Sequence, residues 1–254
     1  MGVSMLFRNK LCLAVDGANL EKVQGVARDF RGCTTTVKIG PSLLLAWGPY
    51  AVRGLSELGM SDIILDARLF GHHQELWQAV TEAAKTAAVK GIVVQTLCGR
   101  DLLSLAVEAA DKSRAVSLRA DAPVVLGMGV PATFTPRVLA ELNIALDSRR
   151  ALVCQQAILC RDAGLHGLIV EYEDIAAVCA VCPELPLIAN TRKRVESYEI
   201  ALSRQEARQP GVCDVLRAGA THAVLDMTLI GHDAEWCADM VGKDLKTLKR
   251  RRRP

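Results

Sequence analysis

The run TTVKIG at residues 35–40 and the run DIILDA at residues 62–67 decide how this chain is expected to fold. Each run is short and rich in β-branched or other apolar side chains, and a longer amphipathic stretch separates the two. Strands buried on both faces have this near-continuous apolar character, and parallel neighbours need a long crossover between them. The two runs therefore predict adjacent parallel strands in a covered sheet.

The same alternation continues along the whole chain. Amphipathic stretches such as 73–89 and 101–117 have helical spacing and lie between the apolar runs. Eight strands, each followed by a helix, in about 250 residues predict a single-domain α/β fold, the (β/α)8 TIM barrel. The six further strands expected are LCLAVD (11–16), GIVVQTL (91–97), PVVLGMG (123–129), GLIVEY (167–172), PLIAN (186–190) and HAVLD (222–226).

A doubly wound open sheet is the alternative fold for this alternation. Such sheets more often carry a glycine-rich phosphate loop after the first strand. Here that turn reads Asp16-Gly17-Ala18-Asn19, without a G-x-G-x-x-G pattern. The turn therefore favours the barrel.

Length and composition also indicate one large domain. The chain has 254 residues, of which 50% are hydrophobic. We expect the barrel to span residues 10–242, between an N-terminal extension at 1–9 and a basic tail at 243–254. No apolar run reaches the ~18 residues of a membrane span. The apolar part of MGVSMLFRNK (1–10) is too short for a signal peptide, so we expect no membrane partner.

Nine cysteines are scattered along the chain, most of them in apolar helix or strand segments. Buried free thiols in a reducing compartment are the simplest explanation, so we predict a cytoplasmic protein. Cys179 and Cys182 have the spacing of a metal or redox pair, but no second pair of cysteines or histidines accompanies them. We therefore expect neither a metal nor a cofactor.

Positive charge is concentrated at the C-terminus. Residues 243–254, KDLKTLKRRRRP, carry seven Lys and Arg residues against one Asp, whereas the whole chain has a net charge of +3. A basic tail can contact nucleic acid or anionic lipid. No basic and aromatic face elsewhere supports such a site, so we expect a solvated end and no nucleic-acid partner.

Charged side chains mark the ends of the expected strands, where barrel enzymes place their chemistry. Lys38 lies inside the apolar run TTVKIG, where an unpaired buried ammonium would be costly. Asp16 and Asp66 end the flanking strands and are the natural anionic partners. They predict a charged cluster at the barrel mouth, either a catalytic site or a structural ion pair. Further polar residues at strand ends are Arg68, Gln95, Thr96, Glu171, Asn190 and Asp226.

Several of these segments carry a family resemblance. LCLAVD (11–16), TTVKIGPSLLLAWGP (35–49) and IILDARLFGHH (63–73) resemble the first three strands of orotidine 5′-monophosphate decarboxylase. The resemblance continues through QQAILCRDAGLHGLIV (155–170) and ends in RAGATHAVLDMTLIG (217–231). It implies a (β/α)8 barrel that acts on a small-molecule substrate and forms a homodimer with its active sites at the dimer face.

The resemblance also implies roles for single residues. Asp16 would match the acid that contacts the ribose, and Gln205 would match a glutamine of the phosphate loop. Lys38 and Asp66 would match the start of an alternating Lys-Asp-Lys-Asp array, which continues as an Asp-x-Lys-x-x-Asp motif. The lysine of that motif gives a proton to the carbon that loses carbon dioxide, and its last acid reaches into the partner subunit's site.

The chain departs from the family pattern at three places. Arg68 stands at the lysine and Gly71 at the second acid of the motif. Arginine stays protonated and is a poor proton donor. Val130 stands where the family's fifth strand offers a hydroxyl, and Asp226-Met227 replaces a Gly-Arg pair that binds phosphate. An acid there would repel a phosphate, so we expect both the parent activity and phosphate recognition to be lost.

A divergent lyase is the first of three hypotheses for function. It would perform decarboxylation or related C–C or C–X chemistry on a nucleoside-like or nucleotide-like small molecule. Its catalytic residues would be Lys38 as acid/base, Asp66 as its orienting partner and Arg68 as a clamp for an anionic group. The expected substrate-binding residues are Asp16, Gln95, Gln205 and Asp226, and cations could also come from Arg192, Lys193 and Arg194.

Two other hypotheses stay open. The altered motif is compatible with a catalytically lapsed barrel that acts as a binding or scaffold subunit. A metal-dependent relative could use Asp66, His72 and His73, but adjacent histidines at a helix start point in different directions and no further ligand is evident. We expect His166 and His222 to be structural, while His232 follows the last strand and could approach the site.

Overall fold

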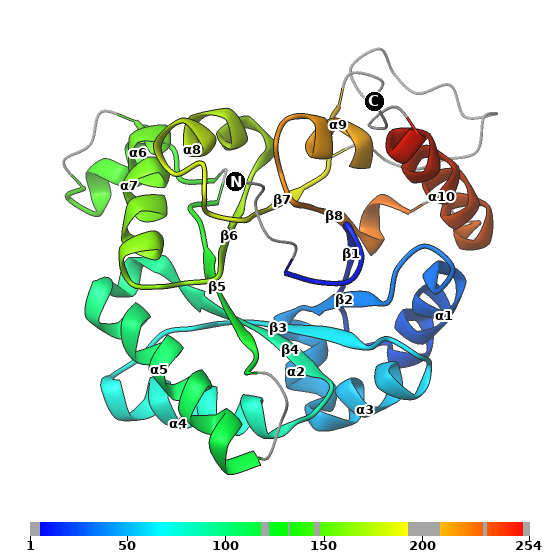
Figure 1. Ribbon diagram of the computed structural model, residues 1–254, viewed down its shortest axis with the longest axis horizontal. Coiled ribbons are helices and arrows are strands. Elements are labelled where there is room, and N and C mark those ends of the chain that lie inside the picture. Colours follow the sequence, from blue (N-terminus) through cyan, green and yellow to red (C-terminus); the bar gives the residue numbers. More distant parts are fainter. Residues whose placement is uncertain are drawn as a thin grey trace.

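The computed structural model describes residues 6–117, 122–131, 133–144, 148–192, 209–230 and 233–250. Within these ranges, eight parallel strands close into a barrel in the order of the sequence, and helices surround them (Figure 1). The strands are β1 (Leu11–Val15), β2 (Thr36–Ile39), β3 (Asp62–Leu69), β4 (Val89–Gln95), β5 (Val124–Met128), β6 (Gly167–Val170), β7 (Leu187–Asn190) and β8 (His222–Asp226). The predicted TIM barrel is confirmed, and the doubly wound alternative is excluded because β1 pairs with both β2 and β8.

The helices follow the strands in the alternating order that the sequence predicts. The α-helices are α1 (Leu20–Phe30), α2 (Pro41–Trp47), α3 (Pro49–Glu57), α4 (His73–Lys85), α5 (Arg100–Ser117), α6 (Pro136–Glu141), α7 (Arg149–Asp162), α8 (Ile175–Val181), α9 (Val212–Arg217) and α10 (Ala234–Arg250). Within the described residues, short 3-10 turns follow β4, β6 and β8, at η1 (Thr96–Cys98), η2 (Tyr172–Asp174) and η4 (Met227–Leu229).

One expected helix is shorter than the sequence pattern suggests. The stretch 73–89 forms α4 only as far as Lys85, because the Ile63 amide donates to the Ala88 carbonyl and Val89 pairs with Ile63. Pairing with the neighbouring strand therefore takes the last residues of the amphipathic stretch. Tertiary contacts of this kind commonly override local periodicity.

Strand alternation divides the apolar side chains between two cores. One face of each strand packs under the helices, and the other face fills the barrel interior. The interior cluster contains Phe7, Cys12, Ala14, Ile64, Val93, Leu126, Met128, Ile169, Ile188 and Val224. The next inward position at the carboxyl end of several strands is polar, and this alternation places Lys38, Asp66, Asn190 and Asp226 at the mouth of the barrel.

The opposite end of the barrel is closed by the N-terminal segment. Phe7 is 5% exposed and its ring meets that of His222 edge to face, with the centroids 5.4 Å apart. Its backbone amide also donates to His222 Nε2 at 3.4 Å. Burial lowers the pKa of His222 to about 4, so the ring is neutral near pH 7. This contact fits the structural role expected for His222, and it places part of the expected extension inside the barrel.

The basic C-terminal segment is helical, in contrast to the solvated end that its composition suggests. Helix α10 runs without a break from Ala234 to Arg250, so the boundary expected between residues 242 and 243 lies within a helix. Val241, Leu245 and Leu248 recur at helical spacing and pack against the core. The expectation of a solvated end is therefore wrong for residues 243–248, because an apolar stripe runs among the lysines.

The fold also bears on the membrane and thiol predictions. Within the part of the chain that the structure describes, no helix is long and apolar enough to cross a membrane. All nine cysteines are free thiols, including Cys179 and Cys182. Burial raises the pKa of each of these two thiols.

Candidate active site

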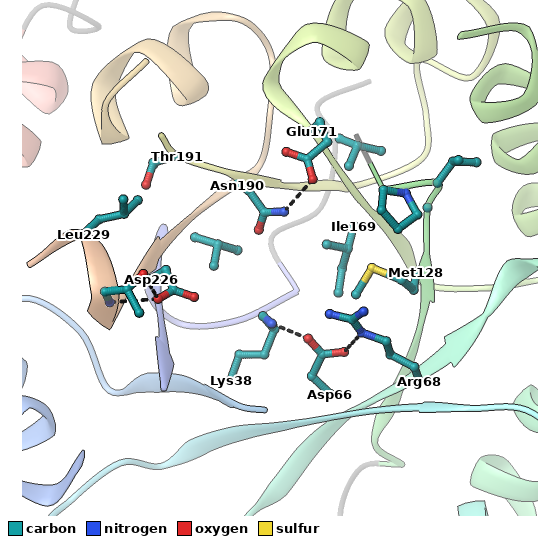
Figure 2. A pocket seen from close by; sticks show the side chains of 16 residues that line it. Lys38, Asp66, Arg68, Met128, Ile169, Glu171, Asn190, Thr191, Asp226 and Leu229 are labelled. Atoms are coloured by element: carbon teal, nitrogen blue, oxygen red, sulfur yellow. Dashed lines mark hydrogen bonds and ion pairs between the residues drawn. The ribbon is translucent and has the colours of Figure 1, made fainter. Parts of the chain in front are cut away.

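A pocket of about 350 Å³ opens at the carboxyl ends of the strands. Barrel enzymes hold their active sites at this end. Figure 2 shows side chains from several strands converging on the pocket. The lining residues are Lys38, Asp66, Arg68, Met128, Gly129, Val130, Pro131, Ile169, Val170, Glu171, Asn190, Thr191, Val224, Asp226, Thr228 and Leu229.

A buried carboxylate between two cations forms one wall of the pocket. Asp66 on β3 is 1% exposed, and Lys38 on β2, 11% exposed, donates from Nζ to Asp66 Oδ2. Arg68 Nε lies 3.5 Å from Asp66 Oδ1, an ion-pair contact without hydrogen-bond alignment (Figure 2). Asp66 Oδ1 therefore accepts no hydrogen bond from the described residues. A buried acceptor left in this state favours a donor from a ligand or water.

A bulge in β3 sets the position of Arg68. Leu65 pairs with Ile92 and Leu69 pairs with Val94, so β3 advances by four residues over a length in which β4 advances by two. The extra residues break the alternation of the strand, as bulges near active sites do. Arg68 adopts a φ of 47°, a left-handed conformation that costs a non-glycine residue about 1–2 kcal/mol. This strained residue presents its guanidinium beside Asp66.

The opposite wall, which we call the acceptor wall, consists of Glu171, Asn190, Thr191, Asp226 and Thr228. Asp226 Oδ1 accepts hydrogen bonds from the backbone amide and the hydroxyl of Thr228, at 2.8 and 2.7 Å. Asn190 Nδ2 donates to Glu171 Oε1 at 3.4 Å. Thr191 is 5% exposed, and its hydroxyl makes no hydrogen bond to the described residues. Polar atoms thus line the pocket on both sides.

Comparisons with known proteins connect this geometry to a family. The chain is 28% identical over 177 residues to the orotidine 5′-phosphate decarboxylase of Syntrophus aciditrophicus, covering 68% of each protein. It is 27% identical over 218 residues to that of Geobacter metallireducens, covering 86% of this chain and 87% of the other. The chain is a relative of the orotidine 5′-phosphate decarboxylases. No protein-family model matches it.

A solved decarboxylase structure agrees with this family at the level of the fold. The orotidine 5′-phosphate decarboxylase from Lactobacillus acidophilus superposes with a TM-score of 0.72 at 15% identity, covering 93% of this chain and 98% of the other. The resemblance to orotidine 5′-phosphate decarboxylases that the sequence motifs indicate is therefore confirmed. The roles of single residues in this chain stay predictions.

Lys38, Asp66 and Arg68, the three residues expected to be catalytic, lie together in the pocket. Asp226, expected to bind substrate, lines it from the far side. Gln95 ends β4 on the same side of the strand as Val93, but it is not part of the pocket lining. Gln205 lies outside the described residues, as do His232, Lys193 and Arg194.

Asp16 does not pair with Lys38 as the sequence predicts, but accepts hydrogen bonds from backbone amides. Its carboxylate accepts hydrogen bonds from the backbone amides of Gly17 at 2.8 Å and Leu43 at 2.9 Å, so it caps the start of α2. A Cβ at Gly40 would lie 2.4 Å from Asp16 Cγ, which shows how tightly the acid is held. Asp16 does not line the pocket in the structure, and its predicted contact with the substrate remains a prediction.

The metal hypothesis gains no support from the histidines. The backbone amide of His72 donates to Glu75 Oε2 at 3.0 Å, an arrangement that begins helix α4. Across the described ranges, no group of three or more His, Cys, Asp or Glu side chains could hold a metal ion.

Cys12 lies in the interior cluster, and its burial raises the pKa of its thiol to about 12 although Lys38 opposes the shift. The thiol therefore stays protonated and is not a nucleophile.

Sequence reasoning misses a buried ion pair that supports the pocket. Arg149 Nη2 donates to both carboxylate oxygens of Asp174, at 2.5 and 2.6 Å, and Arg149 Nη1 donates to the Val130 carbonyl at 2.9 Å. The pair joins the segment after β5 to the turn after β6, and both segments contribute to the pocket lining. No local pattern distinguishes Arg149 from the arginine that follows it, so only the fold reveals this contact.

Proposed function

We propose that this chain is a divergent lyase, related to the orotidine 5′-phosphate decarboxylases, that removes a carboxylate or a comparable leaving group from a nucleoside-like small molecule. The observation that supports this proposal best is the cluster of Lys38, Asp66 and Arg68 in the pocket. A buried carboxylate with one unsatisfied oxygen is costly for stability alone, so its retention favours a function.

The two cations of the cluster would have different catalytic roles. Loss of carbon dioxide breaks a carbon–carbon bond and leaves its electron pair on the substrate carbon. The Lys38 ammonium, oriented by Asp66, is the group that can deliver a proton to that carbon. Arg68 stays protonated, so it holds the leaving carboxylate or stabilises developing negative charge instead of donating a proton.

Turnover with two matched substrates tests this proposal. Purified protein is mixed with orotidine or with orotidine 5′-monophosphate, and carbon dioxide release is followed together with the ultraviolet spectrum. We expect turnover of the unphosphorylated compound and a loss of about 100-fold or more in kcat for Lys38→Ala. Lys85→Ala, an exposed lysine on α4, is the control and should keep full activity.

Two outcomes would contradict the proposal. Turnover of orotidine 5′-monophosphate at a rate that Arg68→Lys does not improve would show that Arg68 leaves the parent chemistry intact. Absence of turnover with both compounds would favour the second candidate, a lapsed barrel that binds a ligand or a partner. This second candidate is supported by the altered motif, in which Arg68 and Gly71 replace the lysine and the second acid.

We also propose that two copies of the chain associate and that the protein is cytoplasmic. Large apolar side chains are exposed on α2, α3 and the segments after β3 and β4, near the pocket end of the barrel. A second copy that covered them would enclose the pocket, which accords with the dimer that the family resemblance implies. The free thiols accord with a reducing compartment.

A further inference from the structure

We infer that the acceptor wall binds an uncharged, hydrogen-bond-donating group of the substrate, such as sugar hydroxyls, and that the substrate carries no phosphate there. This inference rests on the proposed function, because it names the class of molecule that the same pocket receives. It is supported by the hydrogen bonds and ion pairs that the polar atoms around β7 and β8 make, and by those that they leave unmade.

The turn after β8 already holds an anion of its own. Asp226 Oδ1 takes both the backbone amide and the hydroxyl of Thr228, which are the donors that this turn would offer to a phosphate oxygen. A phosphate at this point would lose those donors and would lie against a carboxylate. Asp226 therefore acts against phosphate both by its charge and by its hydrogen bonds.

Among the described residues after β7, Arg192 is a cation near this wall, and it is also engaged. Arg192 lies after β7, and its guanidinium contacts Glu173 Oε1 at 2.6 Å and Glu171 Oε2 at 3.5 Å. Two carboxylates thus share one guanidinium, which leaves little positive potential for an incoming anion. Among the described residues that line the pocket, the cations are Lys38 and Arg68, on the other wall.

The unpartnered atoms of the wall are mostly acceptors. Asp226 Oδ2 accepts no hydrogen bond from the described residues, and Asn190 uses Nδ2 on Glu171, which leaves its carbonyl oxygen for a ligand. The buried Thr191 hydroxyl, unpaired among the described residues, can accept or donate. Phosphate oxygens are acceptors, whereas hydroxyl groups can donate to each of these atoms. Because an unsatisfied buried hydroxyl lowers stability, a ligand that forms a hydrogen bond with it gains affinity.

Binding of matched pairs by calorimetry tests the inference without relying on turnover. The pairs are ribose and ribose 5-phosphate, uridine and uridine 5′-monophosphate, and orotidine and orotidine 5′-monophosphate. We expect the unphosphorylated member of at least one pair to bind ten or more times tighter. Asp226→Asn keeps an acceptor for Thr228 and should reduce the ratio of the two affinities about tenfold. Thr191→Val should lower the affinity for the unphosphorylated member several-fold.

An exposed acid away from the pocket provides the control for this experiment. Asp111→Asn removes an exposed acid from α5, outside the pocket lining, and should leave every ratio unchanged. Tighter binding of the phosphorylated members would overturn the inference, as would an unchanged ratio in a folded Asp226→Asn protein or no binding to any pair at 10 mM. Orotidine that binds without losing carbon dioxide would contradict the proposed function and leave this inference standing.

Discussion

Lys38 and Asp66 are the residues at which charge and burial conflict most directly. Removing one partner of a buried ion pair leaves an uncompensated charge, whereas replacing both with apolar residues is often neutral or stabilising. Arg68 Nε, 3.5 Å from Asp66 Oδ1, compensates part of the loss of Lys38. We therefore expect Lys38→Met to lower the free energy of unfolding by roughly 2–3 kcal/mol.

The double variant Lys38→Met/Asp66→Leu should recover most of that loss. Urea denaturation of the wild type, both single variants and the double variant measures the coupling between the two sites. Equal and additive losses in the two single variants would show that the charges do not depend on each other for stability. Recovery in the double variant would show that the wild-type pair is retained at a cost, as a functional site would require.

His222 is the second residue with a testable charge. Burial lowers its pKa from 6.5 to about 4 in the folded state, so the folded protein favours the neutral ring. The stability that this preference contributes is complete above pH 6.5, and it is lost as the pH falls toward 4 because the unfolded chain takes up the proton first. Between pH 7.5 and 5 the loss amounts to about 2 kcal/mol.

Denaturation curves at these two pH values check the prediction. The difference in unfolding free energy between pH 7.5 and pH 5 should be smaller in His222→Gln by about 2 kcal/mol. A residual dependence is expected, because burial also lowers the pKa of His166. Identical pH dependence in the variant and the wild type would contradict the buried, neutral state of His222 against Phe7.

At the scale of elements, the start of α2 depends on a close approach between two strand ends. Gly40 leaves room for Asp16, whose carboxylate caps the helix through the Leu43 amide. A methyl group at Gly40 would come within 2.4 Å of Asp16 Cγ, so Gly40→Ala must displace the cap. We expect a loss of about 1–3 kcal/mol in unfolding free energy, the range for overfilled sites.

Gly25 in the middle of α1 provides the matched control. A Cβ there meets no atom within 4 Å, so Gly25→Ala should stabilise the protein by about 0.5–1 kcal/mol through the higher helix propensity of alanine. Thermal unfolding of the two variants should therefore move the melting temperature in opposite directions. If both variants melted like the wild type, Asp16 would not be fixed by its contact with Gly40.

The elements also show which parts of the site could be predicted from the sequence. Apolar runs ending in polar residues give the strands, and parallel closure brings Lys38, Asp66 and Asp226 to one mouth. The bulge in β3 leaves no such signal, because it depends on pairing with β4, and neither does the capping by Asp16, which depends on a contact with Gly40. Sequence patterns thus bring Lys38, Asp66 and Asp226 to one end of the barrel, whereas their hydrogen bonds and the place of Asp16 depend on tertiary contacts.

At the scale of the whole molecule, the apolar surface is uneven. Helices α2 and α3 lie on the opposite side of the barrel from α6 (Figure 1). On α2 and α3, Leu45 is 89% exposed, Tyr50 69% and Trp47 42%, and on the segments after β3 and β4 Phe70 is 68% and Leu97 42% exposed. Exposed aromatic side chains grouped in this way are typical of interfaces. This side is therefore where the proposed second copy would bind.

Sedimentation velocity provides the test of that association. The wild type should sediment with twice the chain mass of 27.4 kDa, and Tyr50→Arg/Phe70→Glu should sediment as a monomer because charges at the centre of an apolar contact oppose association. Leu142→Arg places a charge at a leucine that is 52% exposed just after α6, on the other side of the barrel, and should stay dimeric. A monomeric wild type, or a dimer lost in Leu142→Arg but kept in the double variant, would move the interface away from α2 and α3. If the pocket is completed by the partner, the monomeric variant should also lose turnover while its melting curve remains cooperative.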